Sequence, residues 1–231
     1  MILTNSGAIV STVTGTFSVI GSAQIDVITN TGQINRSVSQ GGGDIFNGIG
    51  GTVGGTILGG DGNDIYGISD PLAVIFEAAG EGTADQINAT VSFELAAGSE
   101  VENLTLLGPA SYGFDNEFAN TVTGNGLSNL LLGRNGNDTL NGNADDDTLR
   151  GGIGNVLVNG GDGDDVSRGG TGADSLFGGE GDGGLWQRGG QLRLVAGANS
   201  VVQGDVNGDG VADFEVQLNA IATVSVNDIL L

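Results

Sequence analysis

The stretch from Gly124 to Trp186 divides without gaps into seven units of nine residues, and this repeat limits the possible fold more than any other feature. Every unit opens with glycine. The last three positions of a unit alternate as in a strand, so that one side chain points inward. The first six are too rich in glycine for a strand or a helix, and glycine tolerates the positive φ of a tight turn. Each unit is therefore predicted to be a turn followed by a very short strand. The inward position is apolar in six units and serine in one: Leu131, Leu140, Leu149, Val158, Ser167, Leu176 and Leu185.

Four units carry aspartate at the sixth position: Asp138, Asp147, Asp165 and Asp174. If two units close one flattened coil, units two apart stack, and Asp147 comes to lie next to Asp165. In the other column Val156 separates Asp138 from Asp174. Carboxylates stacked at the strand spacing of roughly 4.8 Å repel one another unless a cation lies between them. We therefore expect the strongest cation site at Asp147 and Asp165, and half-sites at Asp138 and Asp174.

A hard divalent cation with six to eight oxygen ligands suits such a site, and flexible turns that supply many carbonyls favour calcium over magnesium. The chain has no Cys and no His, which disfavours zinc-type sites. The alternative is that these aspartates only form Asx turns, and it stays open for Asp138 and Asp174 above all. The further candidate ligands in the turns are Gly142, Ala144, Gly160 and Asp162.

The tandem G-G-x-G-x-D nonapeptides resemble the RTX family of secreted bacterial proteins. The resemblance implies an all-β fold, a parallel β-solenoid or calcium β-roll with a C-terminal β cap, which binds several Ca2+ ions. It also implies an extracellular location, reached through the type I secretion machinery.

Residues 1–70 contain a second, longer repeat. LTNSGAI at 3–9 recurs 25 residues later as ITNTGQI, and GQINRSV at 32–38 recurs 19 residues later as GTVGGTI. This pattern predicts solenoid coils of about 19 to 25 residues. Asp44 and Asp64 would lie one coil apart and are candidates for a further calcium site, since GGDGNDIYG at 59–67 is a complete nonapeptide. For Asp44, a ladder of turns without metal is an equal alternative.

The remaining segments complete the predicted organisation. Residues 71–114 are expected to form irregular β coils with longer turns, and Glu77, Glu100 and Glu102 to lie on a solvated face. Residues 115–186 form the nonapeptide roll. Its first units carry Asn120 and Asn129 at the sixth position, and these amides are expected to bond neighbouring turns directly, without metal.

Residues 187–231 lose the period and are predicted to cap the roll, with an alternating strand in which Phe214, Val216 and Leu218 share one face. This segment is similar to the serralysin-type C-terminal domain, and its last residues resemble a type I secretion signal. Four residues also resemble the start of an EF-hand loop, although Val216 stands where a bidentate Glu is expected. A plain Asx-rich turn is an equal alternative for these four: Asp205, Asn207, Asp209 and Asp213.

The net charge is −22, with 28 acidic residues against six arginines. This charge argues against nucleic acids and anionic membranes as partners. It should also expand the cation-free chain, which would couple metal binding to folding. No apolar run approaches the ~18 residues of a membrane span. Without His, Cys or Lys, many acid–base and nucleophile arrangements are closed off, and the sequence predicts no enzyme activity.

These observations favour a secreted, non-catalytic calcium-binding module that folds on Ca2+ outside the cell. One alternative is the C-terminal secretion and folding part of a larger exoenzyme, such as a serralysin-like protease, a lipase or an alginate epimerase. Another is a surface or matrix adhesin that binds polysaccharide along a flat solenoid face.

Overall fold

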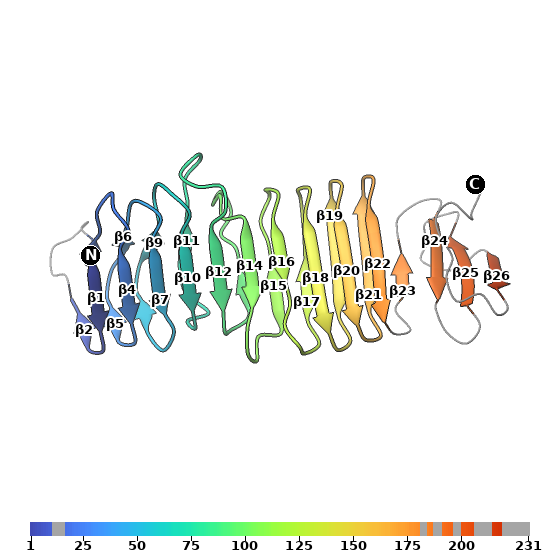
Figure 1. The fold of residues 1–231 in the computed structure, drawn as a ribbon, viewed down its shortest axis with the longest axis horizontal. Coiled ribbons are helices and arrows are strands. Elements are labelled where there is room, and N and C mark those ends of the chain that lie inside the picture. Colours follow the sequence, from blue (N-terminus) through green and yellow to red (C-terminus); the bar gives the residue numbers. More distant parts are fainter. Residues whose placement is uncertain (11–16, 181–183, 187–190, 196–199, 206–213, 219–231) are drawn as a thin grey trace.

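The computed structural model describes residues 1–10, 17–180, 184–186, 191–195, 200–205 and 214–218, with side chains described as far as Gly178. Within these residues all regular structure is β-strand, so this part of the chain offers no helix that could cross a membrane. Parallel strands stack coil upon coil into an elongated solenoid, with the strands lying across its long axis (Figure 1). The predicted all-β parallel solenoid is confirmed.

One wall of the solenoid is a ten-stranded parallel sheet that runs its whole length. Each coil contributes one strand to it, so neighbours in the sheet are neighbouring coils. Its strands, in spatial order, are β1 (Ile2–Asn5), β4 (Val27–Asn30), β7 (Ile45–Gly48), β10 (Ile65–Ile68), β12 (Gln86–Ala89), β14 (Asn103–Leu106), β16 (Thr121–Thr123), β18 (Thr139–Ala144), β20 (Leu157–Asp162) and β22 (Ser175–Glu180).

The rest of each coil changes along the chain, from two further strands to one. The first coils add a three-stranded sheet of β2 (Ala8–Ile9), β5 (Gln33–Ile34) and β8 (Thr52–Val53). They also add a four-stranded sheet of β11 (Val74–Phe76), β9 (Thr56–Leu58), β6 (Val38–Ser39) and β3 (Val19–Ile20). From β12 onward the opposite wall is a single six-stranded sheet: β13 (Phe93–Glu94), β15 (Tyr112–Phe114), β17 (Leu130–Leu132), β19 (Thr148–Ile153), β21 (Val166–Thr171) and β23 (Gly184–Trp186).

The strand register agrees with the repeats read from the sequence. Leu3 pairs with Ile28, which confirms the 25-residue spacing, and Ile34 pairs with Val53, which confirms the 19-residue spacing. In the nonapeptide region Leu140 pairs with Val158, so two units make one coil as predicted. The aspartates of alternate units therefore stack.

The core is a row of apolar side chains that point inward from the sheets. The predicted inward positions Leu131, Leu140, Leu149 and Val158 are fully buried. Ser167 takes the same place and is buried too, although its hydroxyl finds no hydrogen-bond partner in the described part of the chain. The row in the ten-stranded sheet continues toward the N-terminus through Val122, Leu104, Ile87, Tyr66, Phe46 and Ile28.

The strands of the later nonapeptides are longer than predicted. β18 to β22 each span six residues, because the glycine-rich start of the following unit stays paired with the next coil. In β20, for example, Gly161 still pairs with Asn143 of β18. Gly161 has φ of 115° and Asn143 has φ of 85°, so the chain begins to turn while it remains in the ladder. The idea that a glycine-rich segment must leave the sheet was wrong here.

Three antiparallel strands follow the solenoid: β24 (Gln191–Val195), β25 (Ser200–Asp205) and β26 (Phe214–Leu218). β24 contacts β23, the last strand of the six-stranded sheet. The alternating strand predicted around Val216 is β26. The C-terminal residues that resemble a secretion signal lie outside the described part of the chain.

Candidate metal centre

In the units with aspartate at the sixth position, the turn holds this aspartate against the glycine that opens the unit. A Cβ built on Gly142 would overlap both Oδ2 of Asp147 and the carbonyl oxygen of Gly160 in the next coil. A Cβ on Gly160 would likewise overlap Oδ2 of Asp165. Only glycine leaves room for this approach of carboxylate and carbonyl oxygens, which explains why these units open with it. Of the other candidate turn residues, Ala144 pairs with Asp162 at the ends of β18 and β20.

The two oxygens of each stacked aspartate have different surroundings. Oδ1 of Asp165 accepts the backbone N–H of Asp147 at 2.9 Å, and Oδ1 of Asp147 accepts that of Asn129 at 2.6 Å. Oδ2 of both aspartates is buried and has no hydrogen-bond partner among the described residues. Each residue is only 1% exposed. Oδ1 therefore links neighbouring coils, as the Asx-turn alternative predicts, while Oδ2 is left for a ligand that the described residues do not supply.

The same arrangement recurs beyond this pair. Asp138 accepts the N–H of Asn120 at 3.0 Å, and its Oδ2 is again buried without a partner. Asp174 accepts the N–H of Val156 at 3.0 Å. Val156 thus interrupts the carboxylates of this column, as predicted, but not its hydrogen-bond ladder. Whether Asp138 and Asp174 act as half-sites stays a prediction.

Asp44 and Asp64 differ from each other. Oδ1 of Asp44 accepts the N–H of Asp26 at 2.6 Å, and Oδ2 accepts the N–H of Gly41 at 3.0 Å. Asp64 also joins the ladder, since its Oδ1 accepts the N–H of Asp44, but its Oδ2 has no partner in the described region. The geometry therefore favours the turn ladder at Asp44 and keeps Asp64 as a candidate ligand.

Burial changes the ionisation of these carboxyl groups. It raises the pKa of Asp147 to about 6, against the opposing effect of the hydrogen bond from Asn129, and the nearby Asp165 raises it further. Burial also raises the pKa of Asp138 to about 6, and it raises the pKa of Asp165. The charged forms are disfavoured because water has been removed without a countercharge. Buried carboxylate oxygens without partners, next to turn carbonyls, fit a hard cation such as Ca2+.

The asparagines behave as the sequence suggests. The Asn120 side-chain amide donates to the carbonyl oxygen of Val101 at 2.6 Å, and that of Asn129 donates to the carbonyl oxygen of Ala110 at 3.0 Å. An uncharged side chain with its own donor thus joins neighbouring turns without a cation. That these turns need no metal remains a prediction.

The structure adds three buried acids that the sequence reading missed. Glu77 is fully buried, so its placement on a solvated face was wrong, and Asp85 and Asp115 are fully buried as well. Neither oxygen of Asp115 has a partner in the described region, and burial beside Asp138 raises its pKa to about 9. Asp85 offered a signal, since it directly precedes a strand just as Asp64 does. Asp115 occupies the first position of a nonapeptide frame, where glycine is the rule.

The EF-hand-like residues cannot be placed in the same way. Asn207, Asp209 and Asp213 lie outside the described residues, and for Asp205 only the backbone of β25 is described. Their role as ligands stays a prediction.

Comparisons with known proteins agree with this geometry. The family model described as RTX calcium-binding nonapeptide repeat (4 copies) matches residues 123–158 and 159–182. Endo-1,3-1,4-beta-glycanase ExsH of Rhizobium meliloti (strain 1021) is 41% identical over 69 residues, which cover 30% of this chain and 14% of the glycanase. The chain thus spans a small part of that relative's length. No solved structure is similar enough to count as a match. Residues 123–182 are therefore a run of RTX nonapeptide repeats of the calcium-binding type.

Proposed function

We propose that this chain is a secreted, non-catalytic calcium-binding module whose solenoid folds on Ca2+ outside the cell, after type I secretion. A net charge of −22 opposes compaction in the absence of cations. Calcium at the stacked turns would remove part of that repulsion and supply the ligand that the buried carboxylates lack. Metal binding and folding would then be one process.

The observation that carries the proposal is that Oδ2 of Asp147 and Oδ2 of Asp165 are buried and find no hydrogen-bond partner in the part of the chain that the structure describes. These residues lie in adjacent coils, are joined through Oδ1, and face turn carbonyls. A buried carboxylate oxygen without a partner costs roughly 1–3 kcal/mol or more. Ca2+ usually binds six to eight oxygen ligands at about 2.3–2.6 Å. This column offers carboxylate and carbonyl oxygens from both coils.

The test is a calcium titration of the purified chain followed by far-UV circular dichroism. We expect β signal to appear with Ca2+ and not with Mg2+ at the same concentration. The double variant Asp147→Asn with Asp165→Asn keeps the Oδ1 acceptors but removes the charges. It should shift the calcium midpoint upward by about tenfold or more, which corresponds to about 1.4 kcal/mol.

Asp44→Asn is the matched control, because Asp44 is equally buried but both of its oxygens have backbone partners. Its calcium midpoint should shift much less than that of the double variant, because the amide loses only the bond from the Gly41 N–H. A chain that is fully folded in chelator would contradict calcium-triggered folding and leave the aspartates as turn formers.

A second candidate is that the chain is the repeat-bearing part of a larger exoenzyme, which the match to a glycanase favours. In both candidates this segment itself performs no chemistry, in keeping with the absence of His, Cys and Lys. The purified, calcium-loaded chain should therefore release no reducing ends from a mixed-linkage 1,3-1,4-β-glucan. Measurable hydrolysis would place catalysis within these residues and overturn the non-catalytic assignment.

A further inference from the structure

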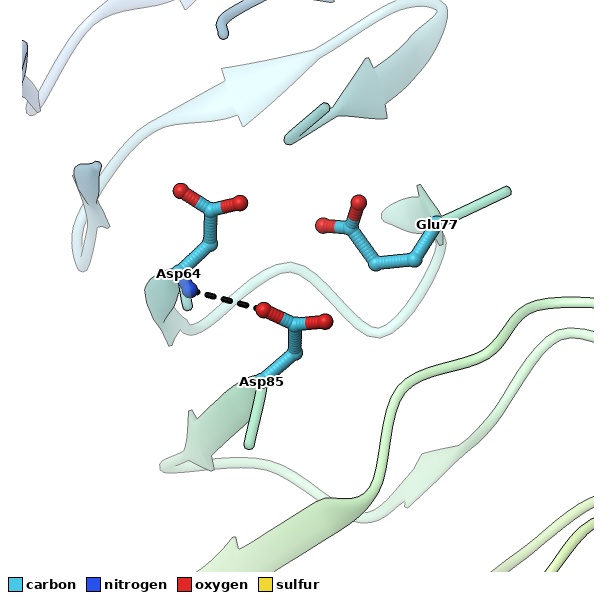
Figure 2. A group of neighbouring side chains, drawn as sticks. All are labelled: Asp64, Glu77 and Asp85. Carbon is cyan, nitrogen blue, oxygen red and sulfur yellow. Dashed lines mark hydrogen bonds between the residues drawn. The ribbon is translucent and has the colours of Figure 1, made fainter. Parts of the chain in front are cut away.

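Three carboxyl groups meet inside the solenoid well before the nonapeptide run. Asp64 precedes β10, Glu77 follows β11 and Asp85 precedes β12. One carboxylate oxygen of each lies within 4.8 Å of the others (Figure 2). All three residues are at most 1% exposed. They lie outside the residues matched by the RTX repeat model.

The strand register explains why these residues converge. Ile65 pairs with Gln86, so the preceding aspartates stand in consecutive coils, and the N–H of Asp64 donates to Oδ1 of Asp85 at 2.7 Å. Glu77 comes from a different sheet, where it directly follows β11. Phe76 pairs with Leu58, which puts Glu77 in register with Gly59.

Gly59 makes room for the Glu77 carboxylate. A Cβ on Gly59 would overlap Oε1 of Glu77 and the hydroxyl of Tyr66, and it would lie 2.6 Å from Oδ2 of Asp64. In the nonapeptide units the first position is glycine in successive coils. Here Glu77 takes that position in one coil, beside Gly59 of the neighbouring coil. Glu77 therefore brings a third carboxylate to a turn that otherwise holds only aspartates.

The hydrogen bonds of the cluster leave two oxygens free inside it. Glu77 is fully engaged, because Tyr66 donates its hydroxyl to Oε1 and Gly60 donates its N–H to Oε2 at 3.1 Å. Asp64 and Asp85 each use Oδ1 in the ladder, and Oδ2 of each is buried without a partner in the described region. A Cβ on Gly82 would overlap Oδ2 of Asp85 and touch the Gly62 carbonyl oxygen at 2.5 Å, so a backbone oxygen lies beside the cluster.

No positive side chain compensates these acids among the residues that the structure describes. The ion pairs found there join Met1 to Asp26 and Arg134 to Glu94. Burial raises the pKa of Asp64 to about 7, of Glu77 to about 8 and of Asp85 to about 6. Three acids in one buried site need bound protons or a cation. The donors are all oxygens, which selects a hard ion.

We propose that Asp64, Glu77 and Asp85 bind a calcium ion at a site separate from those of the nonapeptide run at 115–186. The ion would contact the free Oδ2 atoms of the two aspartates and share Glu77 with the Tyr66 hydroxyl. This site joins the two consecutive coils of β10 and β12, near the point where the coils change from three strands to two. It does not depend on calcium binding by the repeats.

The first test counts ions. Equilibrium dialysis of the full chain against Ca2+ should show that the double variant Asp64→Asn with Asp85→Asn binds one equivalent fewer than the wild type. Asparagine keeps the Oδ1 acceptor of the ladder, which protects the fold. Asp44→Asn, in the same column but with both oxygens occupied, should bind the full number.

The second test uses Tyr66 as a local antenna for Tb3+, which replaces Ca2+ at oxygen sites. The hydroxyl of Tyr66 touches Glu77, so ultraviolet excitation of this ring should sensitise terbium emission. Tyr66→Phe should lose that part of the emission while calcium stoichiometry stays unchanged. Tyr112→Phe is the control, because Tyr112 lies on β15 and is 38% exposed.

The two tests separate this site from the repeats. Asp147→Asn with Asp165→Asn should leave the Tyr66-dependent emission intact even if calcium-induced folding of the repeats is weakened. If the Asp64 and Asp85 double variant binds as many calcium ions as the wild type, the acids hold protons instead and the proposal is wrong. Should that variant fail to fold, terbium emission that is equal in wild type and Tyr66→Phe would overturn the proposal by itself.

Discussion

Replacing Gly142 by alanine should destabilise the calcium-loaded protein by about 3 kcal/mol, the upper range for overpacking a close contact. The new Cβ would overlap Oδ2 of Asp147 and the backbone carbonyl oxygen of Gly160. The carbonyl belongs to a neighbouring coil that is fixed by the ladder, so it cannot move away alone. The carboxylate would have to rotate out of the turn, and the calcium site would be lost although every aspartate is still present.

Gly126→Ala is the matched control in the same run of repeats. A Cβ at Gly126 would meet nothing within 4 Å, and its backbone does not lie in the left-handed region. This variant should keep the wild-type calcium midpoint and gain slightly in stability, because alanine restricts the unfolded chain. Thermal unfolding in calcium and the circular-dichroism titration measure both effects. Equal behaviour of the two variants would show that the close approach at Gly142 is not needed.

The second large effect is a loss of stability with rising pH when calcium is removed by chelator. The buried acids have pKa values above their ordinary range, so the folded state holds more protons than the unfolded state. Stability then falls as pH rises from the unfolded pKa near 4 through the folded values. These are about 6 for Asp147, about 7 for Asp64 and about 9 for Asp115. In chelator the chain should therefore fold only at low pH, where protons take the place of the cation, and its β signal should be lost as the pH rises from about 5 toward about 9.

Asp115→Asn isolates the largest contribution to this decline. Asp115 is fully buried and neither of its oxygens has a partner among the described residues. Removing its charge should move the loss of β signal in chelator to higher pH and change the stability near pH 4 little, as expected when roughly 1–3 kcal/mol of unfavourable burial is removed at high pH only. Asp162→Asn, at an exposed position, should change little at either pH. An equal shift in both variants would mean that general charge, rather than burial, controls the pH dependence.

The strict period made much of this architecture predictable. Because two nine-residue units close one coil, the stacking of Asp147 on Asp165 and the break at Val156 follow from counting alone. The longer spacings in residues 1–70 likewise gave the correct register of Leu3 with Ile28. Inward positions were recognisable from alternation, and even Ser167, which breaks the hydrophobic pattern, is buried where the period places it.

The acids that sit at the glycine position were not predictable in the same way. Glu77 and Asp115 each follow a strand of the second wall, and locally their sequences look like solvated turns. Their burial depends on a residue in another coil. Gly59, for example, has no side chain and so leaves the space that Glu77 fills. The change from three strands to two per coil was also invisible, because short turns and short strands of similar composition alternate throughout residues 1–70.

The hydrogen-bond ladder has a direction. In every rung described above, the N–H belongs to the earlier coil and the carboxylate to the later one, from Asp26 on Asp44 to Val156 on Asp174. The two ends of a growing solenoid are therefore chemically unequal. If assembly starts at the C-terminal coil and adds coils toward the N-terminus, the amide N–H of each new coil finds a carboxylate oxygen already in place. Assembly in the opposite order presents an amide N–H at its edge instead, so the two edges differ in charge and in the partner that they accept.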